Sequence, residues 1–308
     1  MSEIETSTSV QSPNIVARYQ FRHSTRYDYS GPVTFSPHRF VMRPREDHET
    51  RLESMQLTTT PESDIRWTED ITGNIIATAI FKRSAPFLEV VSEFVVAKIG
   101  HAGNPNAQGK ILSAYPPYYL GIEENASYLY RRATYPEQVE KVRSWVLSQN
   151  ILPARGQQGA VIDMLTHNIN VQIGYQRREE SGVQSPMKTL RLKTGSCRDT
   201  AVLLIEGARS LGFAARFVSG YMESSNSKVG RGSTHAWAEV YFPEHGWIGY
   251  DPSIGKRTGL GHVAVATSYH PRGIMPLSGG YNRHGNVYQG MTVSIHSEQL
   301  TAKPQESS

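Results

Sequence analysis

The chain has very little cysteine. Cys197 is the one cysteine among 308 residues, so no disulfide can form within the chain, and zinc sites built from several thiolates are excluded. Chains without disulfides are typical of reducing compartments. Long apolar runs are also missing, since no stretch approaches the ~18 residues of a membrane span. The polar, acidic segment Met1–Ser12 lacks the pattern of a secretory signal. We therefore expect a cytoplasmic protein that does not enter a membrane.

An excess of charge of one sign is absent as well. The formal net charge is +4, from 32 basic and 28 acidic residues dispersed along the chain. A nucleic-acid partner usually requires a clustered basic face, so none is expected. No Walker A, G-x-S-x-G, G-x-G-x-x-G or H-E-x-x-H string occurs, which leaves nucleotide, serine-hydrolase and zincin sites without support. We predict no metal and no cofactor, and the sequence leaves the oligomeric state open.

The first third of the chain has the pattern of β structure. Side chains alternate between apolar and polar from Phe21 to Tyr29, Gly31-Pro32 ends that run, and no helical periodicity occurs before residue 100. Ser/Thr/Glu-rich ends predict disordered tails, and a Gly/Asn/Gln-rich stretch predicts a linker. The predicted organisation is α+β: tail 1–14, antiparallel β domain 15–100, linker 101–110, α+β core 111–300 and tail 301–308.

Helical periodicity starts in the second part of the chain. Pro136 suits the first turn of a helix that ends near Asn150. A second helix is expected over Gly159–Thr166, followed by a strand over Ile169–Tyr175 and a polar loop over Gln176–Pro186.

Cys197 directly precedes the clearest helical pattern. Apolar residues recur at helical spacing up to Gly212, a residue suited to the left-handed end of a helix. They are Ala201, Leu204, Ile205, Ala208 and Leu211. Cys197 is then at a helix N-terminus, where unpaired N–H groups and the helix dipole stabilise a thiolate. Asp199 should partly oppose this effect and Arg198 should partly offset Asp199. The alternative is that Cys197 is a small buried hydrophobe.

A histidine and an aspartate follow on a predicted hairpin. Residues 234–242 alternate as a strand, with His235, Trp237, Glu239 and Tyr241 on one face. Residues 243–246 form a turn, and the returning strand ends at Asp251. Cysteine, histidine and aspartate supply a nucleophile, a base and a residue that orients the base for acyl transfer. Separately, each has a structural reading: His235 as a hydrogen-bonded strand residue and Asp251 as a turn former.

The register of this hairpin tests the triad hypothesis. A symmetric four-residue turn would place Asp251 opposite Ala238 and direct it away from His235. A connection with an odd number of residues places Asp251 opposite Trp237, diagonal to His235 at roughly 7–8 Å. A triad therefore predicts an odd connection or a bulge.

Several motifs together resemble the bacterial transglutaminase-like family. They are Ser185-Pro-Met-Lys-Thr-Leu190, Gly195-Ser-Cys-Arg-Asp199, Arg209-Ser-Leu-Gly-Phe-Ala-Ala-Arg-Phe-Val-Ser-Gly-Tyr221, Thr234-His-Ala-Trp-Ala-Glu-Val240 and Gly246-Trp-Ile-Gly-Tyr-Asp-Pro252. The first part of the chain is similar to the N-terminal β region of that family, through His23-Ser-Thr-Arg-Tyr-Asp-Tyr29, Val33 to Ser36-Pro-His38, and Met42-Arg-Pro-Arg45.

The resemblance implies a papain-like α+β core with Cys197 as nucleophile, His235 as base and acid, and Asp251 as the orienting residue. The family continues Asp-Pro-Thr-Asn-Gly, whereas this chain has Asp251-Pro-Ser-Ile-Gly255, which replaces an amide side chain by Ile254.

The cleft and the reaction are expectations of the same hypothesis. We expect Ser196, Trp237 and Gln184 to line the substrate cleft. The Cys197 N–H is the best candidate oxyanion donor, with a second donor expected from Gln184–Pro186. The expected reaction is acyl transfer at amide bonds of a peptide or protein through a thioester, ending in hydrolysis or transamidation. The alternatives are acetyl transfer by the same triad, and a binding module in which the triad is idle.

Overall fold

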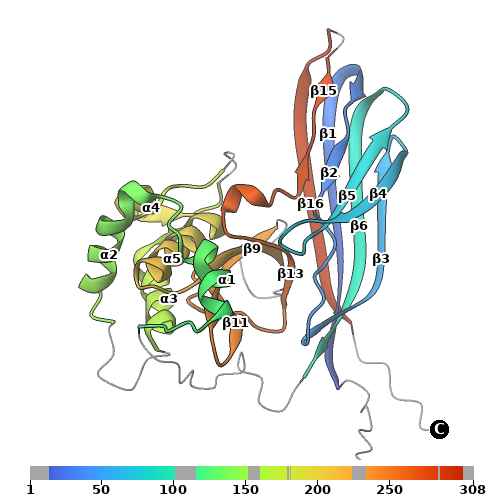
Figure 1. Ribbon diagram of the computed structural model, residues 1–308. Helices are drawn as coiled ribbons and strands as arrows, with labels where there is room; N and C mark the ends of the chain where they lie inside the picture. Colours follow the sequence, from blue (N-terminus) through green and yellow to red (C-terminus); the bar gives the residue numbers. More distant parts are fainter. Residues whose placement is uncertain are drawn as a thin grey trace, which may run out of the picture.

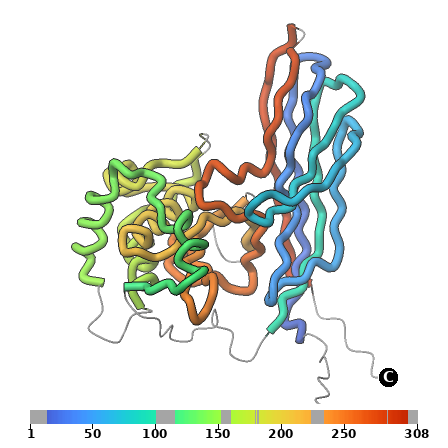
Figure 2. The backbone as a smooth tube through the Cα atoms, in the orientation of Figure 1, coloured from blue at the N-terminus to red at the C-terminus, as the bar shows by residue number. Residues whose placement is uncertain are grey.

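The computed structural model describes residues 14–100, 116–151, 160–178, 180, 182–223, 234–283 and 285–300. The predicted linker, the C-terminal tail and all but the last residue of the N-terminal tail lie outside the described residues. A tall layer of antiparallel strands stands beside a compact body of helices around a separate sheet (Figures 1 and 2). The predicted α+β class is confirmed.

The tall layer contains two antiparallel sheets. The long strand β1 alternates buried and exposed residues, as expected for a strand with one face packed on a core. The first sheet has the order β15-β1-β6-β3, with β16 also paired to β1: β1 (Ile15–Phe35), β3 (Thr50–Thr60), β6 (Ala85–Ile99), β15 (Tyr281–Asn282) and β16 (Tyr288–Leu300). The second has the order β14-β2-β5-β4: β2 (His38–Phe40), β4 (Ser63–Glu69), β5 (Ile75–Phe81) and β14 (Leu277–Ser278).

The end of the described chain returns to the first sheet. β16 pairs with β1 from Arg18↔Leu300 to Tyr29↔Tyr288, and it runs beside β1 in Figure 1. β14 and β15 likewise pair with β2 and β1. Strand pairing therefore crosses the predicted boundary between a domain 15–100 and a core 111–300. The alternation of β16 marks a strand, but nothing local in the sequence names a partner about 270 residues away.

The compact body is built around a five-stranded sheet of order β12-β11-β10-β9-β13. Its strands are β9 (Ala215–Met222), β10 (His235–Phe242), β11 (Gly246–Asp251), β12 (Lys256–Arg257) and β13 (His262–Ser268). The helices are α1 (Ile122–Arg131), η1 (Pro136–Gln138), α2 (Val139–Ser148), α3 (Ala160–Gln172), α4 (Pro186–Leu192), α5 (Cys197–Ser210) and η2 (Pro271–Gly273). The short strands β7 (Gly174–Tyr175) and β8 (Thr194–Gly195) pair in parallel.

Two helices follow the sequence prediction closely. η1 and α2 cover the helix predicted from Pro136, and α5 begins at Cys197 and stops before Gly212, whose φ is +92°. α5 is buried on almost every side, because it packs on β10 and is surrounded by α2, α3 and α4.

The strand predicted over residues 169–175 is wrong for most of its length. α3 continues to Gln172, and β7 contains just Gly174 and Tyr175. Leu165 and Ile169 are fully buried one helical turn apart, and they pack in the same core as α5. Tertiary packing thus extends the helix through residues whose β-branched character suggested a strand.

A shared core joins the tall layer to the compact body. Phe21 of β1, Phe94 of β6 and Tyr221 of β9 pack with ring centroids 5.2–5.3 Å apart. The Tyr221 hydroxyl also lies 2.8 Å from His23 Nδ1, and both side chains are buried. This packing holds β1 and β6 against the sheet that carries the candidate triad.

Candidate functional site

Cys197 is the first residue of α5. Ser196 precedes it in extended conformation as the N-cap, and Asp199 accepts hydrogen bonds from the Ser196 N–H and hydroxyl at 2.9 Å each. Because α5 starts at Cys197, the Cys197 N–H has no acceptor within the helix. The cysteine is buried to 7% exposure at the end of the helix that favours negative charge.

The hairpin of β10 and β11 has the register that the triad requires. Ala238 pairs with Tyr250, Tyr241 with Trp247 and Phe242 with Gly246. The connection has an odd number of residues, and Asp251 lies on the same face of the sheet as His235. The prediction of an odd connection is confirmed, and the symmetric alternative is excluded.

His235 and Asp251 form a buried, direct contact. His235 Nε2 lies 2.6 Å from Asp251 Oδ2, and neither side chain is exposed. The other ring nitrogen, Nδ1, is buried without a hydrogen-bond partner among the described residues. Cys197 lies close enough to this ring to raise the pKa of His235. The ring is therefore held from Nε2, while Nδ1 remains available for the thiol and a substrate.

The electrostatics favour an ion pair. Burial opposes charge on His235, but the charge and hydrogen bond of Asp251, together with Cys197, raise its pKa to about 10. Burial alone would raise the pKa of Asp251, whereas His235 and His262 hold it far below its ordinary value. An imidazolium at neutral pH stabilises a neighbouring thiolate, which is the nucleophilic form of cysteine.

Asp251 has further partners that the sequence does not identify. Ser253 donates to Oδ1 from its N–H at 2.9 Å and from its hydroxyl at 2.5 Å. The replacement of the family's threonine by Ser253 retains this hydroxyl donor. His262 Nε2 lies 3.2 Å from Oδ2. The spacing of His262 from Asp251 in the sequence gives no signal of this contact, because a turn and β12 separate the two.

Asp199 is neutralised by a different arginine from the one expected. Arg178 Nη1 lies 2.8 Å from Asp199 Oδ1, whereas Arg198 donates to the backbone carbonyls of Arg178 and Glu180. The expectation that Arg198 offsets Asp199 is therefore wrong in its partner. Arg178 precedes Asp199 by 21 residues and reaches it because β7 pairs with β8.

A cavity of about 490 Å³ opens on the candidate nucleophile. Cys197, Ser196 and His235 line it together with Phe217 and Ser219 of β9 and with residues of three further regions. These are the loop after β7 (Arg177, Arg178, Val183), the segment around η2 (Pro271, Ile274, Pro276) and β16 (Tyr288, Met291, Val293). The tall layer therefore contributes one wall of the cavity through β16.

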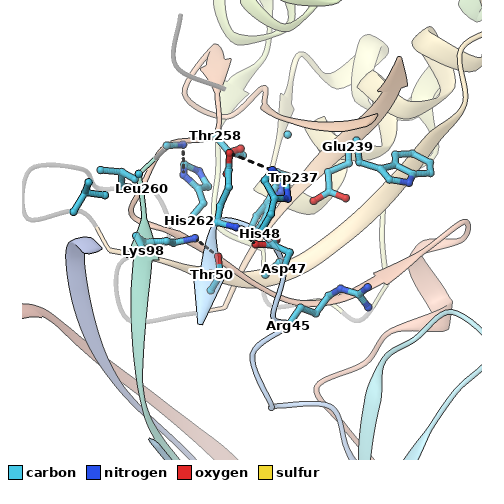
Figure 3. A pocket seen from close by; sticks show the side chains of 17 residues that line it. Arg45, Asp47, His48, Thr50, Lys98, Trp237, Glu239, Thr258, Leu260 and His262 are labelled. Atoms are coloured by element: carbon cyan, nitrogen blue, oxygen red, sulfur yellow. Dashed lines mark hydrogen bonds and ion pairs between the residues drawn. The ribbon is translucent and has the colours of Figure 1, made fainter. Parts of the chain in front are cut away.

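Trp237 and Gln184 do not line this cavity, although Ser196 does. Trp237 packs edge-on against the His262 ring, with centroids 5.3 Å apart, and lines a second cavity of about 350 Å³. Figure 3 shows this second cavity, with Lys98 and Thr50 from the tall layer facing Trp237 and His262. Gln184 is buried, and its N–H donates to Asp199 Oδ1 at 2.7 Å.

The contact of Gln184 with Asp199 limits which groups can donate a hydrogen bond to the oxyanion. The Gln184 N–H is already engaged with Asp199, and Pro186 has no N–H. The backbone of neither residue can supply the second donor. The Cys197 N–H at the start of α5 keeps the geometry of a donor directed out of the helix.

His235, Asp251 and His262 have donor atoms within 4.8 Å of one another, which raises the question of a metal. The Gly259 N–H donates to His262 Nδ1 at 3.1 Å. His262 must then carry its proton on Nε2, where it points at Asp251 instead of offering a lone pair. The donor set fits a hydrogen-bond network better than a metal site.

Comparisons with known proteins agree with the fold. An uncharacterized protein of Mycobacterium tuberculosis, Rv2569c, is 27% identical over 281 residues, covering 85% of this chain and 87% of that protein. YebA of Bacillus subtilis, also uncharacterized, is 33% identical over 73 residues, which are 20% of this chain and 10% of that protein.

A solved structure of a candidate cysteine protease from Cytophaga hutchinsonii matches with a TM-score of 0.70 at 18% identity, covering 94% of this chain and 93% of that one. Residues 19–97 match the model of the bacterial transglutaminase-like N-terminal region, and residues 133–252 match that of the transglutaminase-like superfamily. The second match includes Cys197, His235 and Asp251. The chain thus belongs to the bacterial transglutaminase-like proteins, with the N-terminal region and the core of that family.

Proposed function

We propose that this protein is a cysteine-dependent enzyme that cleaves amide bonds of peptides or proteins through a thioester on Cys197. The observation that carries the proposal is the buried His235–Asp251 contact beside a cysteine at a helix N-terminus. An idle triad would not need a charged pair to be buried, because burying charges without a function is costly.

The chemistry has two steps. The Cys197 thiolate attacks the amide carbonyl carbon, and the resulting oxyanion faces the Cys197 N–H. The C–N bond breaks as His235 Nδ1 gives its proton to the leaving amine, leaving an acyl group on sulfur. Water then attacks the thioester while His235 Nδ1 accepts one of its protons. The C–S bond breaks, the carboxylic acid leaves, and the Cys197 thiolate and the protonated His235 are restored.

The lining of the cavity supports hydrolysis as the main outcome. Ser196, Ser219 and Thr234 lie beside Cys197 and His235, so water can reach the thioester. Exposed apolar side chains at its edge, such as Tyr288 at 49% and Met291 at 52%, suit an extended peptide.

Of the helices in the described residues, none is long and apolar enough to cross a membrane. We propose a cytoplasmic location because a chain with one cysteine has no internal disulfide, which is typical of proteins in reducing compartments.

Mass spectrometry of a peptide library incubated with wild type and Cys197→Ala tests the proposal. We expect cleaved peptides from the wild type alone. Amine-tagged or cross-linked peptides would instead indicate transamidation, and acetylated products that require an acetyl thioester would indicate acetyl transfer. Equal peptide binding by both proteins, without any product, would overturn the enzyme proposal in favour of a binding module.

A further inference from the structure

The network around Asp251 contains a second histidine that a Cys-His-Asp triad does not require. His262, at the start of β13, is 8% exposed and has its Nε2 3.2 Å from the same carboxylate oxygen that contacts His235. We propose that His262 is a positioning residue, which locks the Asp251 carboxylate and thereby the His235 ring. This inference rests on the proposed function of the triad.

The protonation of His262 is set by the backbone. The Gly259 N–H donates to Nδ1 at 3.1 Å, so Nδ1 must be an acceptor, and the ring proton is on Nε2. His262 Nε2–H is then a donor to Asp251 Oδ2. The short turn after β12 fixes this tautomer by keeping Gly259 three residues from His262.

The Asp251 carboxylate is saturated by these contacts. His235 and His262 occupy Oδ2, while the Ser253 N–H and hydroxyl occupy Oδ1. A carboxylate has about four acceptor sites, so no orientation other than the observed one satisfies all its partners. A carboxylate that cannot rotate holds the His235 ring with Nδ1 directed away from Asp251.

The charged groups around His262 favour a neutral ring. Burial lowers its pKa, and the charges of His235 and Lys98 lower it further against the opposing effect of Asp251. A neutral His262 ring donates a hydrogen bond to the Asp251 carboxylate. It carries no positive charge that would compete with His235 for the negative charge of Asp251. Removal of this donor should make the carboxylate easier to protonate, since the hydrogen bond from His262 lowers the pKa of Asp251.

His262 also separates the triad from the second cavity. Its ring lines that cavity together with Trp237 and Lys98 (Figure 3). It does not line the cavity of Cys197. A ligand in the Cys197 cavity would not touch His262. A change at His262 should therefore affect the rate of reaction more than the binding of substrate.

Three variants test the proposal. His262→Leu fills the space without a donor, and His262→Gln keeps an N–H donor at a similar reach. His38→Gln alters another buried histidine, in β2 and outside the triad network, whose Nδ1 lies 2.7 Å from the Ser36 carbonyl. The measured quantity is the rate of Cys197 alkylation by iodoacetamide from pH 4 to 8, with thermal unfolding in parallel.

We expect the acid limb of the alkylation profile to move up by about one pH unit in His262→Leu, to return in His262→Gln and to stay in place in His38→Gln. Peptide cleavage should show a lower kcat in His262→Leu with KM unchanged. A purely structural role would lower Tm in the Leu variant without moving the limb, and that result would overturn the inference.

A nuclear magnetic resonance measurement separates this inference from the proposed function. The ¹⁵N shifts of the His262 ring, assigned by difference with His262→Gln, should report the Nε2–H tautomer at pH 7. An Nδ1–H ring would contradict the positioning role even in an active enzyme. If wild-type Cys197 reacts no faster than free cysteine, that result contradicts the proposed function instead. The ¹⁵N shifts would still show whether His262 Nε2–H donates to Asp251.

Discussion

At the scale of single residues, the site depends on two buried carboxylates with different tasks. Asp251 holds the imidazole, and Asp199 holds the start of the nucleophile helix to the loop that carries Arg178 and Gln184. Both are fully buried, and both accept several hydrogen bonds that compensate for the loss of hydration. The sequence distinguishes them by the strand and the helix on which they occur.

Because of His235, the stability of the folded protein should fall as the pH becomes alkaline. Its pKa is raised to about 10 in the folded state from 6.5, so the folded protein binds a proton that the unfolded chain releases between these values. The stabilisation is fully present below pH 6.5 and is lost as the pH rises through about 10. The free energy of unfolding of wild type relative to His235→Gln should fall across this window by at most about 1.4 kcal/mol per pH unit.

Urea unfolding of both proteins at pH 6, 8 and 10 measures this difference. A difference that stays constant over the three pH values would contradict the buried imidazolium.

Asp199→Asn should destabilise the protein by about 3–5 kcal/mol, because it leaves Arg178 without its buried partner. Glu180→Gln is the matched control: Glu180 pairs with the same arginine at 3.3 Å but is 74% exposed. That variant should change stability by less than about 0.5 kcal/mol. Chemical denaturation of both variants checks the prediction. Equal losses in the free energy of unfolding would show that the contact of Arg178 with Asp199 contributes no more than its contact with Glu180.

At the scale of elements, strand register is what brings the triad together. Cys197 begins α5, His235 begins β10 and Asp251 ends β11, so the three groups meet at one edge of the body. The hairpin register could be predicted from the triad hypothesis, because an odd connection is what places His235 and Asp251 on the same face. The contacts of Arg178 with Asp199 and of His262 with Asp251 could not be predicted from the sequence. They depend on β7, β8 and β13 meeting at the same edge of the body.

Gly220 is the residue of β9 opposite His235, and it leaves no room for a side chain. A Cβ there would lie 2.2 Å from the Val263 carbonyl and 2.7 Å from the Trp237 ring. Gly220→Ala should therefore push β13 away and cost about 1–3 kcal/mol of stability. Cys197 alkylation should slow with it, because β13 carries His262.

Gly290→Ala is the control, since a Cβ at Gly290 of β16 meets nothing within 4 Å. Thermal unfolding and alkylation rates of both variants decide the point. A Gly220→Ala protein with wild-type values would show that β9 and β13 can separate without effect on the site.

At the scale of the whole molecule, the tall layer and the compact body share one core and one cavity. β16 completes the first sheet and also lines the cavity of Cys197. The sequence predicts the layer and the body as classes of structure, from their alternation and helical periodicity. Their joining rests on contacts such as that of His23 with Tyr221, 198 residues apart, which no local pattern encodes.

Tyr221→Phe tests this joining. It removes the hydroxyl that lies 2.8 Å from His23 Nδ1 and should cost about 1–3 kcal/mol, because a buried ring nitrogen loses its partner. We expect layer and body to unfold in one transition in both proteins, with a lower Tm for the variant. Tyr128→Phe, at a tyrosine of α1 that is 64% exposed, should have no effect. Calorimetry that resolves two separate transitions in the wild type would contradict a common core.

The central claim is that His235 and Asp251 activate Cys197 as a nucleophile. The most direct measurement is the rate at which iodoacetamide alkylates Cys197 at pH 6 in the wild type, His235→Gln and Asp251→Asn, with Ser253→Ala as a mild neighbouring control. We predict that the wild type reacts faster than free cysteine, that the first two variants lose about 100-fold and that Ser253→Ala loses a few-fold. A wild-type rate equal to that of free cysteine, unchanged in His235→Gln and Asp251→Asn, would contradict the account.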